Sequence, residues 1–175
     1  TWVATGEHVI GETLGIGSFT RDSNGTVQEA DVLYRPYAAQ HTRQPQLPMF
    51  FRDVELADRI GFEYSGSSAG AAADDFMGRL ENIREQMDAT GHDGLRVVTI
   101  VVDGENAWEN YDNDGIDFLD AMYTELVAAD WLTTVTPSQL IEAFPDRFEP
   151  LPDVFPASWF QPNFATWIGE SQEAK

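Results

Sequence analysis

The sequence predicts an α/β protein with a mainly parallel sheet, because short strand-like runs alternate along the chain with helix-like ones. The clearest strand is the β-branched run at residues 97–102, since a continuous Val and Ile run is typical of a strand buried on both faces. The clearest helix covers residues 71–89, where apolar side chains recur at helical spacing. No internal repeat or linker interrupts this pattern, so a single domain is expected over residues 1–175.

The other elements follow from local patterns, giving four or five strands in all. Apolar or aromatic runs bounded by turn residues predict strands at residues 2–5, 32–37, 49–51 and 131–135. Shorter helices are expected at residues 9–14, 54–60, 117–129 and 137–144, the last with Thr136 as its cap and Pro137 at its first position. In the helix at residues 71–89, one apolar stripe is formed by Phe76, Leu80, Ile83 and Met87.

Charge and composition exclude several classes of partner. Thirty acidic residues face ten basic ones, which gives a net charge of −20 at pH 7. Such a surface repels nucleic acids and anionic membranes, because phosphate binding needs a positive patch. No run approaches the roughly 20 apolar residues of a membrane helix. The lack of cysteine excludes disulfides, thiolate metal sites and a cysteine nucleophile. A neutral substrate, a cation or a high-salt environment suits this charge.

The excess of acidic residues is interpreted as an adaptation to high salt. Repulsion among these charges destabilises the folded chain at low ionic strength and is screened at salt concentrations above about 0.1 M. We therefore expect the melting temperature to rise between low and molar NaCl. A melting temperature that stays constant over this range would rule the interpretation out.

The strand predicted at residues 97–102 ends in a polar cluster that begins Asp103-Gly104-Glu105-Asn106 and continues with Trp108 and Glu109. The carboxyl ends of parallel strands carry the chemistry in open α/β sheets and in barrels, so Asp103 is the predicted functional centre. The alternative is that Asp103 and Gly104 form only a turn and that the glutamates are a solvated helix start. A metal-dependent hydrolase using Asp53, Asp103, Glu105 and a histidine is disfavoured, because the sequence has no His-x-His or His-x-x-x-His spacing.

Four segments carry a resemblance to a known enzyme family. They are residues 2–9 (WVATGEHV), 51–62 (FRDVELADRIGF) and 103–109 (DGENAWE), and a closing segment at residues 158–169 with Ser158, Trp159, Asn163, Phe164 and Trp167. In this order they resemble the C-terminal part of the catalytic domain of glycoside hydrolase family 57, which includes α-amylases, amylopullulanases, 4-α-glucanotransferases and branching enzymes. Gly6 stands where the family has Asp, and Ala57 where serine is common.

The resemblance implies a portion of a (β/α)₇ barrel and a retaining mechanism on α-glucans. In that mechanism one carboxylate attacks the sugar while a second, about 5–5.5 Å away, protonates the leaving oxygen. The family motif places the general acid/base on Asp103, and a partly buried strand end suits an acid that must hold a proton. The nucleophilic glutamate of the family lies upstream of residue 2, and Glu7 follows that strand, so Glu7 is not assigned this role. We therefore expect a fragment of a longer catalytic domain, inactive alone.

Further roles follow from residue type and position. Sugar contacts are expected from Arg52 and Asp53 at a strand end and from the rings of Trp108, Trp159 and Trp167, although core packing is an equal alternative for each ring. Supporting positions behind the catalytic residue are Glu105, Glu109 and Asn163. The expected partners are an α-glucan and either the remainder of the catalytic domain or a second copy of the chain, with no metal or other cofactor. A non-catalytic carbohydrate-binding or scaffolding domain of the same fold is the competing function.

Overall fold

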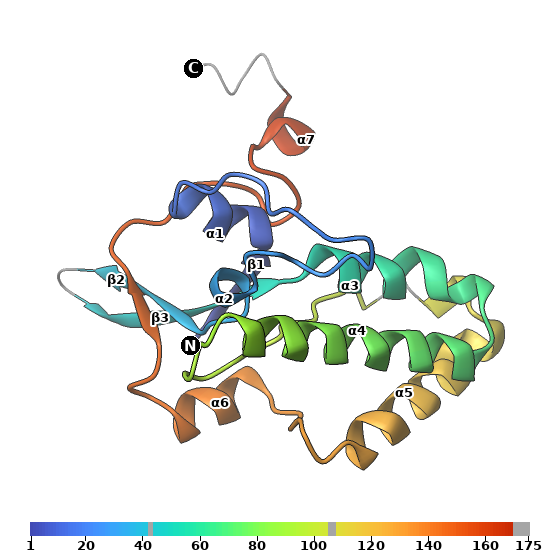
Figure 1. Cartoon of the computed structure of the whole chain (residues 1–175). Coiled ribbons are helices and arrows are strands. Elements are labelled where there is room, and N and C mark those ends of the chain that lie inside the picture. Colours follow the sequence, from blue (N-terminus) through green and yellow to red (C-terminus); the bar gives the residue numbers. More distant parts are fainter. Residues whose placement is uncertain (42–43, 105–107, 170–175) are drawn as a thin grey trace.

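The computed structural model describes residues 1–41, 44–104 and 108–169. Within these ranges one mixed sheet runs through the molecule, with helices on both faces (Figure 1). Its strands are β1 (Val3–Gly6), β2 (Tyr37–His41), β3 (Gln44–Arg52) and β4 (Glu149–Leu151), in the order β1-β3-β2-β4. β1 runs parallel to β3 and β2 parallel to β4, while β2 and β3 are antiparallel.

Side-chain alternation along β3 divides the core between the two faces of the sheet. Phe51 packs into the larger apolar cluster, together with buried side chains of α1 (Glu7–Thr13), α2 (Ala30–Leu33), α3 (Val54–Asp58) and α4 (Ala69–Ala89). Phe50 points to a smaller cluster with Ala38, Leu140 and Phe148, under α6 (Pro137–Ala143). The sheet is therefore covered on both faces, as the predicted α/β class requires.

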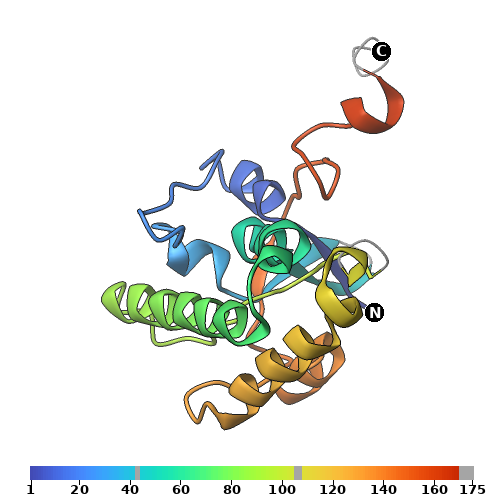
Figure 2. The ribbon, with the colours of Figure 1, turned by 90° about the vertical axis from the view of Figure 1, so that its right-hand side faces the viewer.

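The two longest helices lie where the sequence predicted them. In α4, the stripe residues Phe76, Leu80, Ile83 and Met87 are all buried. α5 (Ile116–Ala128) packs along α4, and the two lie side by side in Figures 1 and 2. α6 begins with the predicted cap, a capping box between Thr136 and Gln139 with Pro137 in the first turn.

An aromatic cluster fixes the chain from Trp108 to the start of α5. Tyr111 stacks on Phe118 of α5 at 5.3 Å between ring centroids, and Trp108 packs against Tyr111 at 5.7 Å. The Tyr111 hydroxyl donates a 2.5 Å hydrogen bond to the carbonyl of Ile60, in a π-helical turn at Arg59–Glu63 that follows α3. Burial raises the pKa of Tyr111 to about 12, so its hydroxyl stays protonated as the donor at neutral pH.

Three predicted strands are corrected by the structure. Residues 97–102 form no strand; only Thr99 bridges to a neighbour, Arg52, because β3 ends there, and the run is half-buried rather than enclosed on both faces. The strand predicted at residues 32–37 is wrong, because α2 and a turn occupy most of these residues and β2 begins only at Tyr37. The strand predicted at residues 131–135 is absent, because these residues pair with none of the described strands; the Trp131 ring packs against the Arg84 guanidinium, 4.6 Å away.

β3 is longer than the predicted strand, since it extends over Gln44–Arg52 rather than residues 49–51. The predicted barrel portion is not confirmed, because the described residues form an open sheet with one antiparallel pair of strands. Across these same residues, no helix has the length and apolar character needed to cross a membrane. α7 (Ala165–Ile168) stands apart from the body of the molecule in both ribbon views (Figures 1 and 2).

Candidate active site

Three chain segments end side by side at one edge of the sheet. β1 pairs in parallel with β3 and ends with Gly6 opposite Arg52. Thr99 bridges in parallel to the same Arg52, and its carbonyl accepts a 3.2 Å hydrogen bond from the Asp53 amide. The segment from Thr99 to Asp103 therefore leaves the sheet at the carboxyl end of the parallel strands, although it is not itself a strand.

A cavity of about 160 Å³ opens at this edge. Among the described residues it is lined by Ala4, Thr5, Arg52, Val101, Asp103 and Trp159. Asp103 is exposed, which differs from the partial burial expected at a strand end, so the described part of the chain does not enclose its carboxyl group. The cavity brings together three side chains predicted from the sequence: an acid, a cation and an aromatic ring.

Arg52 is buried although it carries a charge, with only 8% of its surface exposed. One guanidinium nitrogen lies 3.4 Å from the carbonyl of Val101, and the other lies 3.4 Å from a carboxylate oxygen of Asp58. The guanidinium carbon lies 5.1 Å from the centre of the Trp159 ring, a cation–π contact. Its Nε is buried and has no hydrogen-bond partner within the described residues.

Next to Arg52 in the chain, Asp53 forms a buried polar cluster with Tyr34 and with Glu7 and Arg21, which are partly buried. The Tyr34 hydroxyl donates a 2.5 Å hydrogen bond to Asp53 Oδ2, and Asp53 Oδ1 accepts 3.1 Å from the Leu56 amide as the cap of α3. Arg21 reaches both acids, at 3.2 Å from Asp53 and 2.5 Å from Glu7. The cluster joins the ends of β1 and β3 to the loop that carries Arg21.

Two carboxylates share one guanidinium in this cluster. Burial and the neighbouring charges shift the pKa values of Glu7, Arg21 and Tyr34. Burial raises the pKa of the Glu7 carboxyl, because Arg21 and the Val54 amide offset only part of its lost hydration. Burial acts to lower the pKa of Arg21, but the negative charges of Asp53 and Glu7 outweigh it and raise that pKa. The pKa of Tyr34 lies well above its usual range, since burial and the adjacent Asp53 both disfavour the phenolate.

The raised pKa of Glu7 predicts a specific pH dependence of stability. Between the ordinary value of 4.5 and the raised value, the folded chain holds a proton on Glu7 that the unfolded chain releases. Rising pH therefore lowers the free energy of unfolding in this window. We expect the difference between the wild type and Glu7→Gln, measured by urea denaturation, to fall through this window and to level off above it.

The exposed Glu142 of α6 supplies a matched control. The difference between the wild type and Glu142→Gln should show no such fall in the same denaturation series. A Glu7→Gln difference that rises with pH would contradict the assignment, because it would mean that folding favours the ionised carboxylate.

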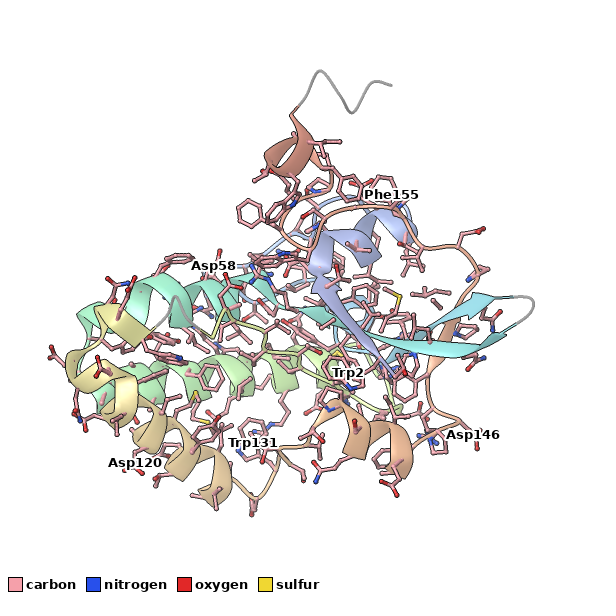
Figure 3. All side chains as sticks on the ribbon, turned by 180° about the vertical axis from the view of Figure 1, so that it is seen from behind. Trp2, Asp58, Asp120, Trp131, Asp146 and Phe155 are labelled. Carbon is pink, nitrogen blue, oxygen red and sulfur yellow. The ribbon has the colours of Figure 1, made fainter. Side chains whose placement is uncertain are left out.

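The closing segment packs over the carboxyl end of β1. Ser158 is buried, and its carbonyl lies 2.7 Å from Nε2 of His8 at the start of α1. The Trp167 indole nitrogen donates a 2.8 Å hydrogen bond to the Ser158 hydroxyl. Figure 3 labels Phe155, just before this segment, beside α1; its amide donates 3.0 Å to the Thr13 hydroxyl.

The other predicted site residues lie outside the cavity lining. Asp53 is 2% exposed and is engaged by the buried cluster. Trp108 packs in the aromatic cluster, so the packing alternative describes its position, and Trp167 is 59% exposed. Glu109 is exposed, and Asn163 accepts a 2.9 Å hydrogen bond from the Ala165 amide at the start of α7. Glu105 lies outside the described residues. Within the described ranges, no group of three or more His, Cys, Asp or Glu side chains is placed to hold a metal ion.

Comparison with protein families gives a match that covers most of the chain. The model of glycosyl hydrolase family 57 matches residues 8–152. The chain belongs to glycosyl hydrolase family 57. A search among curated proteins found no match.

Several residues of this family 57 chain escaped sequence reasoning. Glu7 lies in a segment that carried the resemblance, but its burial beside the Arg52-Asp53 pair depends on strand order. Arg21 was given no role and Tyr34 was expected only within a strand. No local pattern marks an ion pair across 32 positions, from residue 21 to residue 53. The glycine at position 6, where the family has Asp, marks a different feature. A Cβ there would lie 2.3 Å from the Trp159 carbonyl oxygen, so glycine allows the closing segment to approach.

Proposed function

We propose that this chain is part of a retaining glycoside hydrolase or transglycosylase that acts on α-glucans, with Asp103 as its general acid/base. Membership of glycosyl hydrolase family 57 supports glycoside chemistry. The observation that carries the assignment within the chain is the cavity at the carboxyl edge of β1 and β3, where Asp103, Arg52 and Trp159 meet. It is the position at which open α/β sheets and barrels hold their substrates.

Each of these side chains suits a step of glycosidic cleavage. The Trp159 ring offers an apolar face on which a sugar ring can stack, and Arg52 offers hydrogen-bond donors to sugar hydroxyls. Asp103 donates a proton to the leaving oxygen, so that the glycosidic bond breaks without release of an alkoxide. In the second step the same carboxylate removes a proton from the water or sugar hydroxyl that attacks the glycosyl-enzyme.

The attacking carboxylate of this mechanism is proposed to lie upstream of residue 2, in a longer catalytic domain with a (β/α)₇ barrel. Asp53 is fully engaged in the buried cluster, and Glu7 accepts hydrogen bonds from Arg21 and Val54, so neither is free to attack a sugar. The edge of β1 that faces away from β3 is the place where the sheet would continue.

Activity measurements on the chain and on the longer protein test the proposal. We expect the longer protein to cleave starch or pullulan with retention of the anomeric configuration, followed by proton NMR of the first product. The chain alone should give no turnover, because it lacks the attacking carboxylate. Turnover by the purified chain alone would refute the upstream nucleophile. A longer protein that binds α-glucans without cleaving them would instead support the non-catalytic alternative.

A further inference from the structure

We propose that Gly6 and His8 are positioning residues that seat the closing segment on the carboxyl end of β1 and thereby hold the Trp159 ring in the wall of the cavity. We call the contacts of Gly6 and His8 with the closing segment the seat. The effect of the seat on α-glucan binding rests on the proposed function, whereas the existence of the seat does not. Neither residue lines the cavity, so both act through the closing segment.

Gly6 supplies the space for this contact. A Cβ on residue 6 would lie 2.3 Å from the Trp159 carbonyl oxygen, closer than real Cβ contacts come, and that oxygen belongs to the backbone. The backbone angles of Gly6, φ −80° and ψ 156°, are extended and open to any residue. Glycine is therefore needed here for close approach between two segments rather than for its conformational freedom.

His8 supplies the hydrogen bond. Its Nε2 lies 2.7 Å from the Ser158 carbonyl, and because a carbonyl oxygen can only accept, this nitrogen carries a proton and donates it. The bond joins residues 150 positions apart in the sequence. Gly6 and His8 are two residues apart, and they contact the backbone of two adjacent residues, Trp159 and Ser158.

Ser158 connects the contacts of Gly6 and His8 to the Trp159 ring. Ser158 is only 5% exposed, and its hydroxyl accepts hydrogen bonds from the Phe160 amide at 3.3 Å and from the Trp167 indole at 2.8 Å. The next residue, Trp159, places its ring over Arg52 beside the cavity. Residues 152–164 contain no helix or strand of their own, so local backbone structure does not hold the ring in this place. Contacts with α1 and β1 supply the restraint instead.

A thiol-labelling experiment tests the seat without any need for catalysis. The chain contains no cysteine, so Ser158→Cys places a single thiol at a buried position of the full chain. We expect Gly6→Ala to raise the labelling rate of this thiol by about tenfold, the effect of about 1.4 kcal/mol on an opening equilibrium. Gly70→Ala is the matched control, since open space surrounds its Cβ position, and it should leave the rate unchanged.

A second pair of variants covers the case in which Gly6→Ala does not fold. His8→Leu removes the donor to Ser158 and should also raise the labelling rate. His8→Gln retains an N–H donor and should bring the rate back toward that of the parent. Equal rates in the parent, His8→Leu and His8→Gln would overturn the seat, as would an unchanged rate in a folded Gly6→Ala variant.

Kinetics of the longer protein test the role of the seat in positioning Trp159. A ring that contacts the sugar equally before and during the reaction contributes uniform binding, so Gly6→Ala should raise KM for α-glucan by about tenfold with kcat nearly unchanged. Faster labelling with an unchanged KM would overturn the positioning role. A longer protein without activity on α-glucans would overturn the proposed function, while the labelling rates would still decide the seat.

Discussion

Replacing Asp103 with asparagine is expected to lower the turnover of α-glucans by the longer protein by about 10²–10⁴-fold, the usual contribution of a general acid/base. The amide has the shape of the carboxyl group but cannot donate its proton to the leaving oxygen. Because Asp103 is exposed, the substitution should leave the free energy of unfolding nearly unchanged. Turnover and urea denaturation of the same preparation separate these two effects.

A change of leaving group distinguishes an acid from a residue that merely shapes the cavity. A nitrophenyl glucoside releases a phenolate that needs little protonation, so Asp103→Asn should impair its bond-breaking step far less than it impairs starch cleavage. A variant that loses activity equally on both substrates would contradict the assignment of Asp103 as the acid. Asp146→Asn is the control, since Asp146 is exposed and in Figure 3 lies far from Asp58, which contacts Arg52 of the cavity.

The position of Asp103 shows how a correct placement can follow from a partly wrong element. The sequence predicted a strand over residues 97–102, and the structure has only the Thr99 bridge. The pattern reports the apolar character of the side chains but says nothing of how far a neighbouring strand extends, and β3 ends at Arg52. The bridge is parallel, so residues 97–102 run in the direction expected of the predicted strand. Asp103 therefore lies at the carboxyl edge as expected.

The long-range contacts of the site were beyond sequence reasoning for a different reason. The helix stripe of α4 and the cap of α6 depend on neighbours within a turn or two, and both were predicted. The ion pair of Arg21 with Asp53 and the bond of His8 to Ser158 depend on where loops return to the sheet. Loop closure follows from the whole packing and leaves no periodic trace in the sequence.

The largest expected loss of stability comes from Asp53→Ala, at about 3–5 kcal/mol of unfolding free energy. Asp53 is 2% exposed and is contacted by the Tyr34 hydroxyl, the Leu56 amide and the Arg21 guanidinium. Alanine removes the cap of α3 and leaves the hydroxyl and part of the guanidinium buried without a partner, and both changes are costly. Urea denaturation of the wild type and the variant measures the difference.

Two further variants apportion this loss between the cap and the buried charge. Ser68→Ala removes the cap of α4, an exposed site where the Ser68 hydroxyl accepts from the Ala71 amide, and should cost about 1 kcal/mol. Asp53→Asn keeps an oxygen for the Leu56 amide and for Arg21 but removes the charge, so its loss should fall between those of the two alanine variants. If Asp53→Ala costs no more than Ser68→Ala, then Asp53 acts only as a helix cap, and the buried cluster contributes nothing to holding β1 and β3 together behind Asp103.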